Sequence, residues 1–277
     1  MVCKLEGAVE ICVDADYVPI DAPIDPSIDA PSDRDLDGVF DVADLCPDIA
    51  DPAQANEDGD RFGDACDPCP PIADDAPPDP DGDGVGGVCD PNPTTPGDRI
   101  VLFTGFHAGV PAGWTVTGTW ADVGGAVAAA PASDEQMVMF TPIVPDLTGT
   151  ASASFVVTSI ATGGRGMGIA LPLSLAADRG IICEPFLNTG TQNRKLGLVR
   201  LDNLAVLADT AVAWLDNKPL VASVTRMGST FTCRFEHEGL THVLTAMDAN
   251  SPPDPRVAFR TRSISGRVEW MMYVDSP

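Results

Sequence analysis

The sequence is poor in basic residues and contains no long apolar run. Sixteen Lys and Arg stand against 41 Asp and Glu, which gives a formal net charge of −25. An acidic field of this size repels nucleic acid and anionic membrane surfaces, so we expect neither as a partner. The longest apolar candidate, residues 166–177, is interrupted by Pro172 and falls short of the roughly 18 to 20 residues that cross a bilayer. We therefore expect no membrane span.

Histidine and closely spaced cysteines are also scarce, which argues against a zinc site. The chain has 3 His, and among its 8 Cys only Cys66 and Cys69 have the Cys-x-x-Cys spacing. An even number of cysteines is compatible with disulfides in an oxidising compartment, so we expect an extracellular or cell-surface protein. The first residues, Met1–Glu6, contain no hydrophobic signal segment. We expect the export signal to have been trimmed or to lie upstream of a misplaced start.

Charge divides the chain unevenly. Residues 1–97 contain 25 acids and 3 bases, whereas residues 98–277 contain 16 acids and 13 bases. Within the acidic part, residues 13–32 are rich in Asp, Ala and Pro, which is typical of an extended spacer and resembles spacers of bacterial surface proteins. Before the spacer, Cys3 is either lipidated or paired with Cys12, and we favour the small disulfide loop. We expect domains at 1–32, 33–97 and 98–277.

Three acidic loops in the second segment recur with a period of 23 residues. They begin at Asp33, Asn56 and Asp79, and the cysteines keep the same step, since Cys46 recurs as Cys69 and Cys66 as Cys89. A fixed period indicates a repeat array in which each unit packs against its neighbours. A merely solvated acidic linker has no reason to repeat with its glycines and cysteines in register.

Oxygen-bearing residues alternate within each loop in the pattern that calcium requires. A twelve-residue loop can offer oxygens from positions 1, 3, 5, 7, 9 and 12, the seventh through a backbone carbonyl. Gly38 occupies the sharp turn at position 6, Arg61 stands there in the second loop, and Gly87 leaves position 9 of the third loop without a side chain. The third site is therefore expected to be weaker or less regular. The predicted ligands are Asp33, Asp35, Asp37, Val39, Asp41 and Asp44; Asn56, Asp58, Asp60, Phe62, Asp64 and Asp67; and Asp79, Asp81, Asp83, Val85 and Asp90.

The loops carry more charge than one cation each would neutralise. Together they hold 14 acids and two arginines, which favours more than one calcium ion per loop. Asp51 and Asp74, again 23 residues apart, are further candidate ligands.

The array resembles the thrombospondin type 3 repeat. Asp33-x-Asp-x-Asp-Gly-x-x-Asp-x-x-Asp-x-Cys46-Pro matches the longer motif of that family, and the segments 56–67 and 79–90 resemble its shorter one. Proline dipeptides after each loop exclude flanking helices. The resemblance implies an irregular fold wound around calcium and the disulfides Cys46–Cys66 and Cys69–Cys89. The substitutions Arg61 and Gly87 depart from the pattern.

Beyond residue 98, short apolar runs alternate with Gly, Pro and Asp turns. Such a pattern predicts an all-β sandwich. Cys183 and Cys233, each in a strand-like run, are a candidate bridge within it. The expected strands are 99–104, 114–120, 136–141, 151–160, 166–173, 196–201, 220–226, 231–235, 241–247, 256–260 and 268–274.

The order of landmarks in this region resembles the concanavalin A-like, laminin G-like jelly roll. Residues 102–106 and 113–120 look like its opening strands, and residues 256–261 and 268–274 look like the strands that close it. Folds of this kind host lectins, adhesion modules and hydrolases alike, so the resemblance implies a fold rather than an activity.

No catalytic cluster is visible in the sandwich region. The Glu-x-Asp-x-x-Glu run that glycosidases of this fold use is absent. Glu236 and Glu238 are interpreted as a solvated strand face, and Trp114 and Trp120, six residues apart, as core residues on the same strand face. We therefore predict a non-catalytic surface protein in which a calcium-stiffened stalk presents a sandwich that binds a polysaccharide or a surface protein. The alternative is a secreted glycan hydrolase whose carboxylates come from separate strands.

Overall fold

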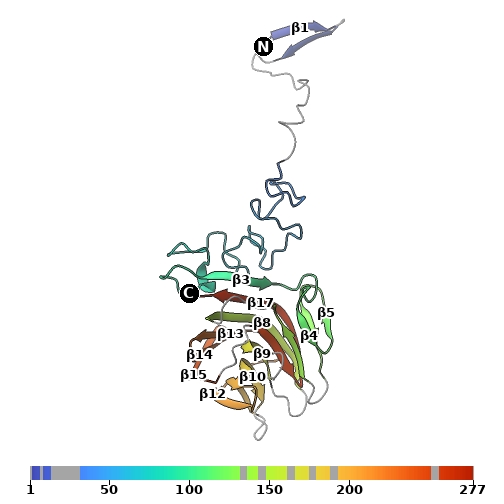
Figure 1. Ribbon diagram of the computed structural model, residues 1–277. Helices are drawn as coiled ribbons and strands as arrows, with labels where there is room; N and C mark the ends of the chain where they lie inside the picture. Colours follow the sequence, from blue (N-terminus) through green and yellow to red (C-terminus); the bar gives the residue numbers. More distant parts are fainter. Residues whose placement is uncertain are drawn as a thin grey trace. The chain divides into compact units, whose positions relative to one another are not determined.

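In the computed structural model, the chain falls into two compact units, Met1–Pro52 and Ala53–Pro277 (Figure 1). Within the described residues, no helix is long and apolar enough to cross a membrane. The residues that the structure describes are 2–6, 9–13, 32–131, 136–142, 148–160, 166–174, 179–187, 193–250 and 256–276.

The first unit contains a β-hairpin and the first acidic loop. Strands β1 (Val2–Glu6) and β2 (Val9–Val13) pair antiparallel, and their register places Cys3 directly opposite Cys12. A disulfide between them remains a prediction. Of the predicted spacer at 13–32, residues 14–31 lie outside the described residues. The first loop has turns and bends but no helix or strand.

The second unit contains a sandwich of two antiparallel sheets. One sheet has the order β12-β11-β10-β9-β16-β7-β4, and the other has the order β15-β14-β13-β8-β17-β6-β5, with β3 also paired to β17 (Figure 1). The strands are β3 (Arg99–Thr104), β4 (Thr115–Thr117), β5 (Trp120–Asp122), β6 (Val127–Ala129), β7 (Gln136–Phe140), β8 (Gly149–Ile160), β9 (Gly166–Leu173), β10 (Gly180–Leu187), β11 (Arg194–Arg200), β12 (Ala205–Ala211), β13 (Pro219–Met227), β14 (Thr230–His237), β15 (Leu240–Met247), β16 (Ala258–Arg262) and β17 (Ile264–Asp275). The predicted all-β sandwich is confirmed.

Alternation along the strands builds the core between the sheets. On β14, Phe231, Cys233 and Phe235 are fully buried, while Arg234 and Glu236, which alternate with buried residues, are exposed. Period-2 alternation sends the buried set toward the facing sheet and the others outward. Cys233 forms a disulfide with Cys183 of β10, which ties the two sheets together.

One predicted strand is wrong. Residues 114–120 do not form a single strand, because Gly118 has a φ of 74° and separates β4 from β5. Trp114 and Trp120 therefore do not share a strand face. Trp114 packs edge-on against Phe106, and Trp120 packs edge-on against Phe259. Both indoles are partly buried against the core, as expected for core residues.

The outer face of the eight-stranded sheet is partly covered by the acidic repeats. Cys69, Val85 and Cys89 form one buried cluster with Trp270, Met272 and Val274 of β17. Beside it, the carboxylate Oε2 of Glu57 lies 3.2 Å from Nε2 of His107. The Glu57 side chain lies directly against the backbone of Gly105, because a Cβ atom added to this glycine would lie 2.0 Å from Oε2 of Glu57. The second and third loops are therefore packed on the sandwich.

Candidate functional site

Each acidic loop is shaped by the same hydrogen bonds, repeated at the 23-residue step. The side-chain oxygen at position 1 accepts a backbone N–H from position 4, at 2.8 Å in the first loop, 2.6 Å in the second and 2.8 Å in the third. Position 4 has a positive φ in all three loops, where it is Leu36, Gly59 and Gly82. Side-chain capping of this kind fixes a tight turn without a helix or strand.

The aspartate at position 5 anchors the loop to the chain that follows. Oδ2 of Asp37 accepts the N–H of Asp51 at 2.9 Å. In the second loop Oδ2 of Asp60 accepts the N–H of Asp74 at 3.0 Å, and in the third Oδ2 of Asp83 accepts that of Gly97 at 3.0 Å. The sequence period is therefore also a period of tertiary contacts.

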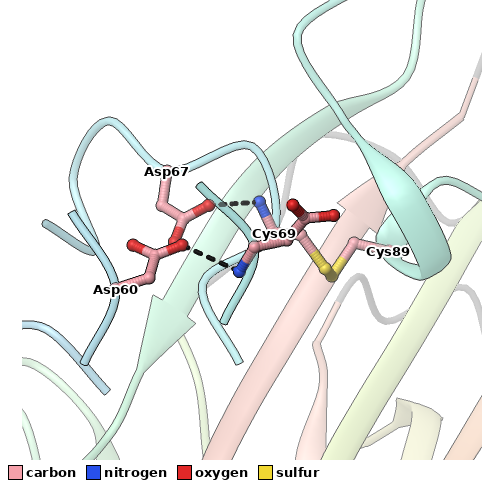
Figure 2. Close-up of a disulfide and its surroundings, with 5 residues drawn as sticks. Asp60, Asp67, Cys69 and Cys89 are labelled. Carbon is pink, nitrogen blue, oxygen red and sulfur yellow. Dashed lines mark hydrogen bonds between the residues drawn. A yellow bond between two sulfur atoms is a disulfide. The ribbon is translucent and has the colours of Figure 1, made fainter. Parts of the chain in front are cut away.

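Three groups of carboxylates converge, one in each loop. Within each group the ligand oxygens all lie within 4.8 Å of one another. In the second loop, Asp60 and Asp67 lie side by side next to the Cys69–Cys89 disulfide (Figure 2), and Oδ1 of Asp67 accepts the N–H of Cys69 at 2.7 Å. The groups are Asp33, Asp35 and Asp37; Asp58, Asp60 and Asp67; and Asp79, Asp81 and Asp83.

Position 3 has the same unusual feature in every loop. Oδ2 of Asp35, of Asp58 and of Asp81 is buried and has no hydrogen-bond partner. Burial and the surrounding carboxylates raise the pKa of all three. An unpaired buried carboxylate oxygen is costly unless a cation compensates it.

The carboxylates at position 12 of the second and third loops also have raised pKa values. Burial and the carboxylates of Asp60 and Asp58 raise the pKa of Asp67 to about 6. Burial, together with nearby Asp98 and Asp81, raises the pKa of Asp90 to about 6.

Several predicted ligands lie outside the three groups. At position 9, Oδ1 of Asp41 accepts the N–H of Arg34 at 3.0 Å, and Oδ1 of Asp64 accepts that of Glu57 at 2.8 Å. Both carboxylates therefore close the loop onto its own second residue. Asp44, Asn56 and Asp90, and the backbone carbonyls of Val39, Phe62 and Val85, stay predicted ligands.

Two departures from the repeat motif have structural explanations. Position 6 has a positive φ in the first and third loops, at Gly38 and Gly84, but Arg61 in the second loop does not, so a side chain is tolerated there. The Arg61 guanidinium instead lies 4.5 Å from the ring centre of Phe62. Gly87 begins the 3₁₀ turn η1 (Gly87–Cys89), and its N–H donates to the carbonyl of Pro78 at 2.8 Å.

Asp98 is a buried acid outside the set of predicted ligands. Its side chain is fully buried, and it accepts hydrogen bonds of 3.1 Å from the backbone and side-chain nitrogens of Asn92. Its own N–H donates to Oδ2 of Asp83 at 2.8 Å. The 23-residue step from Asp51 to Asp74 leads next to residue 97, so the position of Asp98 one residue later is the sequence feature that could have identified it.

These residues suit calcium by the chemistry of their donors. The groups offer carboxylate oxygens only, which are the ligands of hard cations such as Ca²⁺. When bound, the ion would neutralise the carboxylates at positions 1, 3 and 5 of the first and third loops and those at positions 3, 5 and 12 of the second.

A cleft of about 660 Å³ lies between the third loop and the outer face of the eight-stranded sheet. Residues 88–92 of the repeat form one wall, and side chains of β8, β13, β14 and β17 form the other. The sheet wall offers hydroxyl groups from β8 and β13 and apolar surface from β13 and β17. The hydroxyl residues are Thr150, Ser152, Ser223 and Thr225, and the apolar ones are Val221, Met227, Trp270 and Met272. No charged cluster of the metal-binding kind lies on the sheet wall among the described residues.

The sequence matches no family model, and no curated protein sequence matches it. Solved structures similar to this chain include the carbohydrate-binding module CBM66 from Bacillus subtilis, at 16% identity over 57% of this chain and 92% of that one, with a TM-score of 0.43. The legume lectin-like domain from Entamoeba histolytica is similar at 14% identity over 59% and 90%, with a TM-score of 0.43. Lectin II from Ulex europaeus is similar at 13% identity over 64% and 100%, with a TM-score of 0.46. Function is therefore inferred from the residues of the chain itself.

Proposed function

We propose that this chain is an extracellular calcium-binding protein whose calcium-ordered repeats support a non-catalytic β-sandwich that binds a glycan or a protein ligand. The observation that supports it most strongly is the repeated, unpaired Oδ2 at position 3 of the loops, in Asp35, Asp58 and Asp81. Three equivalent buried oxygens without donors are explained together by a cation in each loop.

Calcium has a structural rather than a catalytic role in this proposal. The second and third loops share a buried cluster with β17, so ordering the loops also orders a face of the sandwich. Sites with dissociation constants of about 10⁻⁴ to 10⁻³ M are typical of extracellular calcium modules and would be filled outside the cell. The disulfides Cys69–Cys89 and Cys183–Cys233 fit the same oxidising location.

The hydrolase alternative has weaker support. Hydrolysis of a glycosidic bond needs two carboxyl groups facing one open groove. In the cleft, Glu236 is paired with Arg234 at 2.6 Å, and Oδ1 of Asp90 accepts the N–H of Asn92 at 2.7 Å. Burial raises the pKa of Glu184 to about 7, but this carboxylate is 2% exposed and lies 3.4 Å from the buried guanidinium of Arg260.

Thermal unfolding with and without calcium tests the proposal. A ligand that binds only the folded state at a hundred times its dissociation constant adds about 2.7 kcal/mol per site. We expect calcium at millimolar concentration to raise the unfolding midpoint of the disulfide-intact chain by several degrees, and magnesium to raise it much less. Coinciding unfolding curves in calcium and in chelator would contradict the proposal.

A further inference from the structure

The sheet wall of the cleft is built from rows of hydroxyl groups on adjacent strands. The register places Thr150 of β8 beside Thr225 of β13, and their hydroxyl oxygens lie 2.9 Å apart. The next row brings Ser152 of β8 beside Ser223 of β13. Short hydroxyl side chains leave room above the sheet and present both donors and acceptors.

The charges that line the cleft are balanced. Arg226 and Arg234 are the cations of its lining, and Asp90 and Glu236 are the anions. Oε1 of Glu236 accepts hydrogen bonds from Arg234, which leaves other donor and acceptor positions of this pair directed to solvent or ligand. A strongly charged ligand would meet as many like charges as opposite ones and would be repelled by the like charges. A neutral polar ligand would not meet this repulsion.

Apolar side chains lie on both walls of the cleft. On the repeat wall, Val88 is 81% exposed and Ile72 is 46% exposed. Trp270 and Met272 lie on the opposite wall and belong to the buried cluster beneath the repeats. A lining that combines apolar groups with hydroxyl groups suits the mixed polar and apolar faces of sugar rings.

The position of the cleft within the sheet argues against an extended peptide. Strands β8, β13, β14 and β17 each have neighbours on both sides in the sheet order. Their backbone groups are already paired, so a peptide strand has no free edge to extend here. Recognition must therefore use side chains.

We propose that this cleft binds a neutral oligosaccharide or polysaccharide chain, and that binding depends on calcium in the third loop. The inference rests on the binding role proposed above for the sandwich. The volume of about 660 Å³ lies within the range of about 300 to 1,000 Å³ that small-molecule sites occupy.

Calcium dependence follows from how the repeat wall is held. Asn92 in that wall is fixed by Asp90 and Asp98, and Asp98 is fixed in turn by Asp83 of the third loop. The wall is also anchored by the Cys69–Cys89 disulfide (Figure 2). If the third loop loses its cation, the repelling carboxylates of Asp81 and Asp83 loosen the wall that shapes the cleft.

Affinity electrophoresis of the full chain tests this proposal. Native gels would contain mixed-linkage β-glucan, xylan, galactomannan or starch, with carboxymethyl cellulose as the anionic comparison and calcium throughout. We expect at least one neutral polysaccharide to retard the wild-type chain and carboxymethyl cellulose to retard it less. Retardation by none of the neutral polysaccharides would overturn the proposal.

Variants locate the site and separate it from overall folding. Ser223→Phe fills the cleft, and the double substitution Arg234→Ala/Glu236→Ala removes an exposed pair from its lining. Each should weaken retardation at least tenfold. Thr245→Phe adds the same ring as the first variant to an exposed position of β15 outside the cleft lining, and should bind as the wild type does. Wild-type retardation of both cleft variants would overturn the location.

The calcium link is tested by equivalent substitutions in two loops. Asp81→Ala in the third loop should weaken retardation at least fivefold more than Asp35→Ala in the first, because only the third loop belongs to the cleft wall. Equal effects would overturn the link. Calcium uptake measured on the same samples separates the two proposals: a chain that takes up calcium but binds no polysaccharide overturns the cleft alone, and a chain that takes up none overturns the proposed function.

Discussion

Single aspartates carry the strongest evidence for a bound cation. Asp35, Asp58 and Asp81 occupy equivalent positions, and the buried Oδ2 of each has no hydrogen bond. Neighbouring carboxylates at positions 1 and 5 already accept backbone N–H groups. Backbone donors therefore shape the loop, and in every loop Oδ2 at position 3 is left for a positively charged ligand.

Proton and calcium should compete for Asp67 and Asp90, and this fixes the sign of the pH dependence. Their pKa values of about 6 in the folded chain lie above the usual value of 3.8. Without calcium, the stability that protonation contributes is full below about pH 4 and is lost as the pH rises through about 6. With calcium the carboxylates must be ionised, so calcium-dependent stability is lost as the pH falls through the same range.

We therefore predict opposite pH trends for the two states. As the pH falls from 7.5 to 5, the calcium-stripped chain should gain stability, whereas the dissociation constant for calcium should rise at least tenfold. Unfolding midpoints and calcium titrations at both pH values measure this. The control is Asp67→Asn/Asp90→Asn, which removes the titrating groups and should flatten both trends. Parallel trends in the wild-type chain would contradict the competition.

At the scale of elements, the packing of the repeats on β17 is the feature that joins the two candidate sites. Cys69 and Cys89 lie within the buried cluster that includes Trp270 and Met272. Their disulfide closes a separation of 20 residues, which constrains the unfolded chain by roughly 3 kcal/mol in the entropic model.

Removing this disulfide should release the repeats and leave the sandwich folded. We predict that Cys69→Ser/Cys89→Ser costs roughly 3 kcal/mol of repeat stability and makes residues 53–97 sensitive to protease in calcium. The matched control, Cys183→Ser/Cys233→Ser, should instead lower the main unfolding transition of the sandwich. Limited proteolysis measures the protection of the repeats, and urea unfolding measures the transition of the sandwich. Repeats that stay protected from protease in the first variant would contradict their packing on β17.

Most strands were predictable because their runs alternate or end at clear turn residues. Residues 99–104 and 166–173 were predicted with the bounds that the structure has. Three strands of the sandwich were missed: β6 is only three residues long, β10 includes Pro185, and β12 alternates partly buried with exposed residues and contains Asp209. Trp114 and Trp120 were misplaced because Gly118 was read as part of a strand rather than as a turn.

The packing of the repeats on the sheet was not predicted, although the sequence contains a clue. Residues 270–274 read Trp-Met-Met-Tyr-Val without alternation, which is typical of a strand buried on both faces. One face fills the sandwich core through Met271 and Tyr273, and the other contacts the repeats through Trp270 and Met272. Which segment covers the second face depends on tertiary contacts that no local pattern specifies.

The candidate ligands were more predictable than the cleft. Spacing alone predicted the acids of the three carboxylate groups, because calcium loops use neighbouring residues of one short segment. The cleft combines residues 71–95 with strands that begin beyond residue 148. Asp98 was missed for a related reason, since it lies beyond the third loop in the sequence and only the fold brings it to Asp83 and Asn92.

At the scale of the whole molecule, charge is concentrated where cations are expected. Residues 1–97 hold 25 of the 41 acids and only 3 of the 16 bases. Self-repulsion of this size opposes a compact arrangement unless counter-ions are bound. In the function proposed above, calcium uptake is thus the property on which the repeats, their packing on the sandwich and the wall of the cleft all depend.

Isothermal titration of the disulfide-intact chain, freed of metal and then supplied with calcium, tests this property most directly. We predict uptake of at least three calcium ions per chain, one for each carboxylate group, with at least one fewer in Asp58→Ala. A titration without measurable heat or uptake, confirmed by equilibrium dialysis, would contradict the calcium-binding function from which the rest follows.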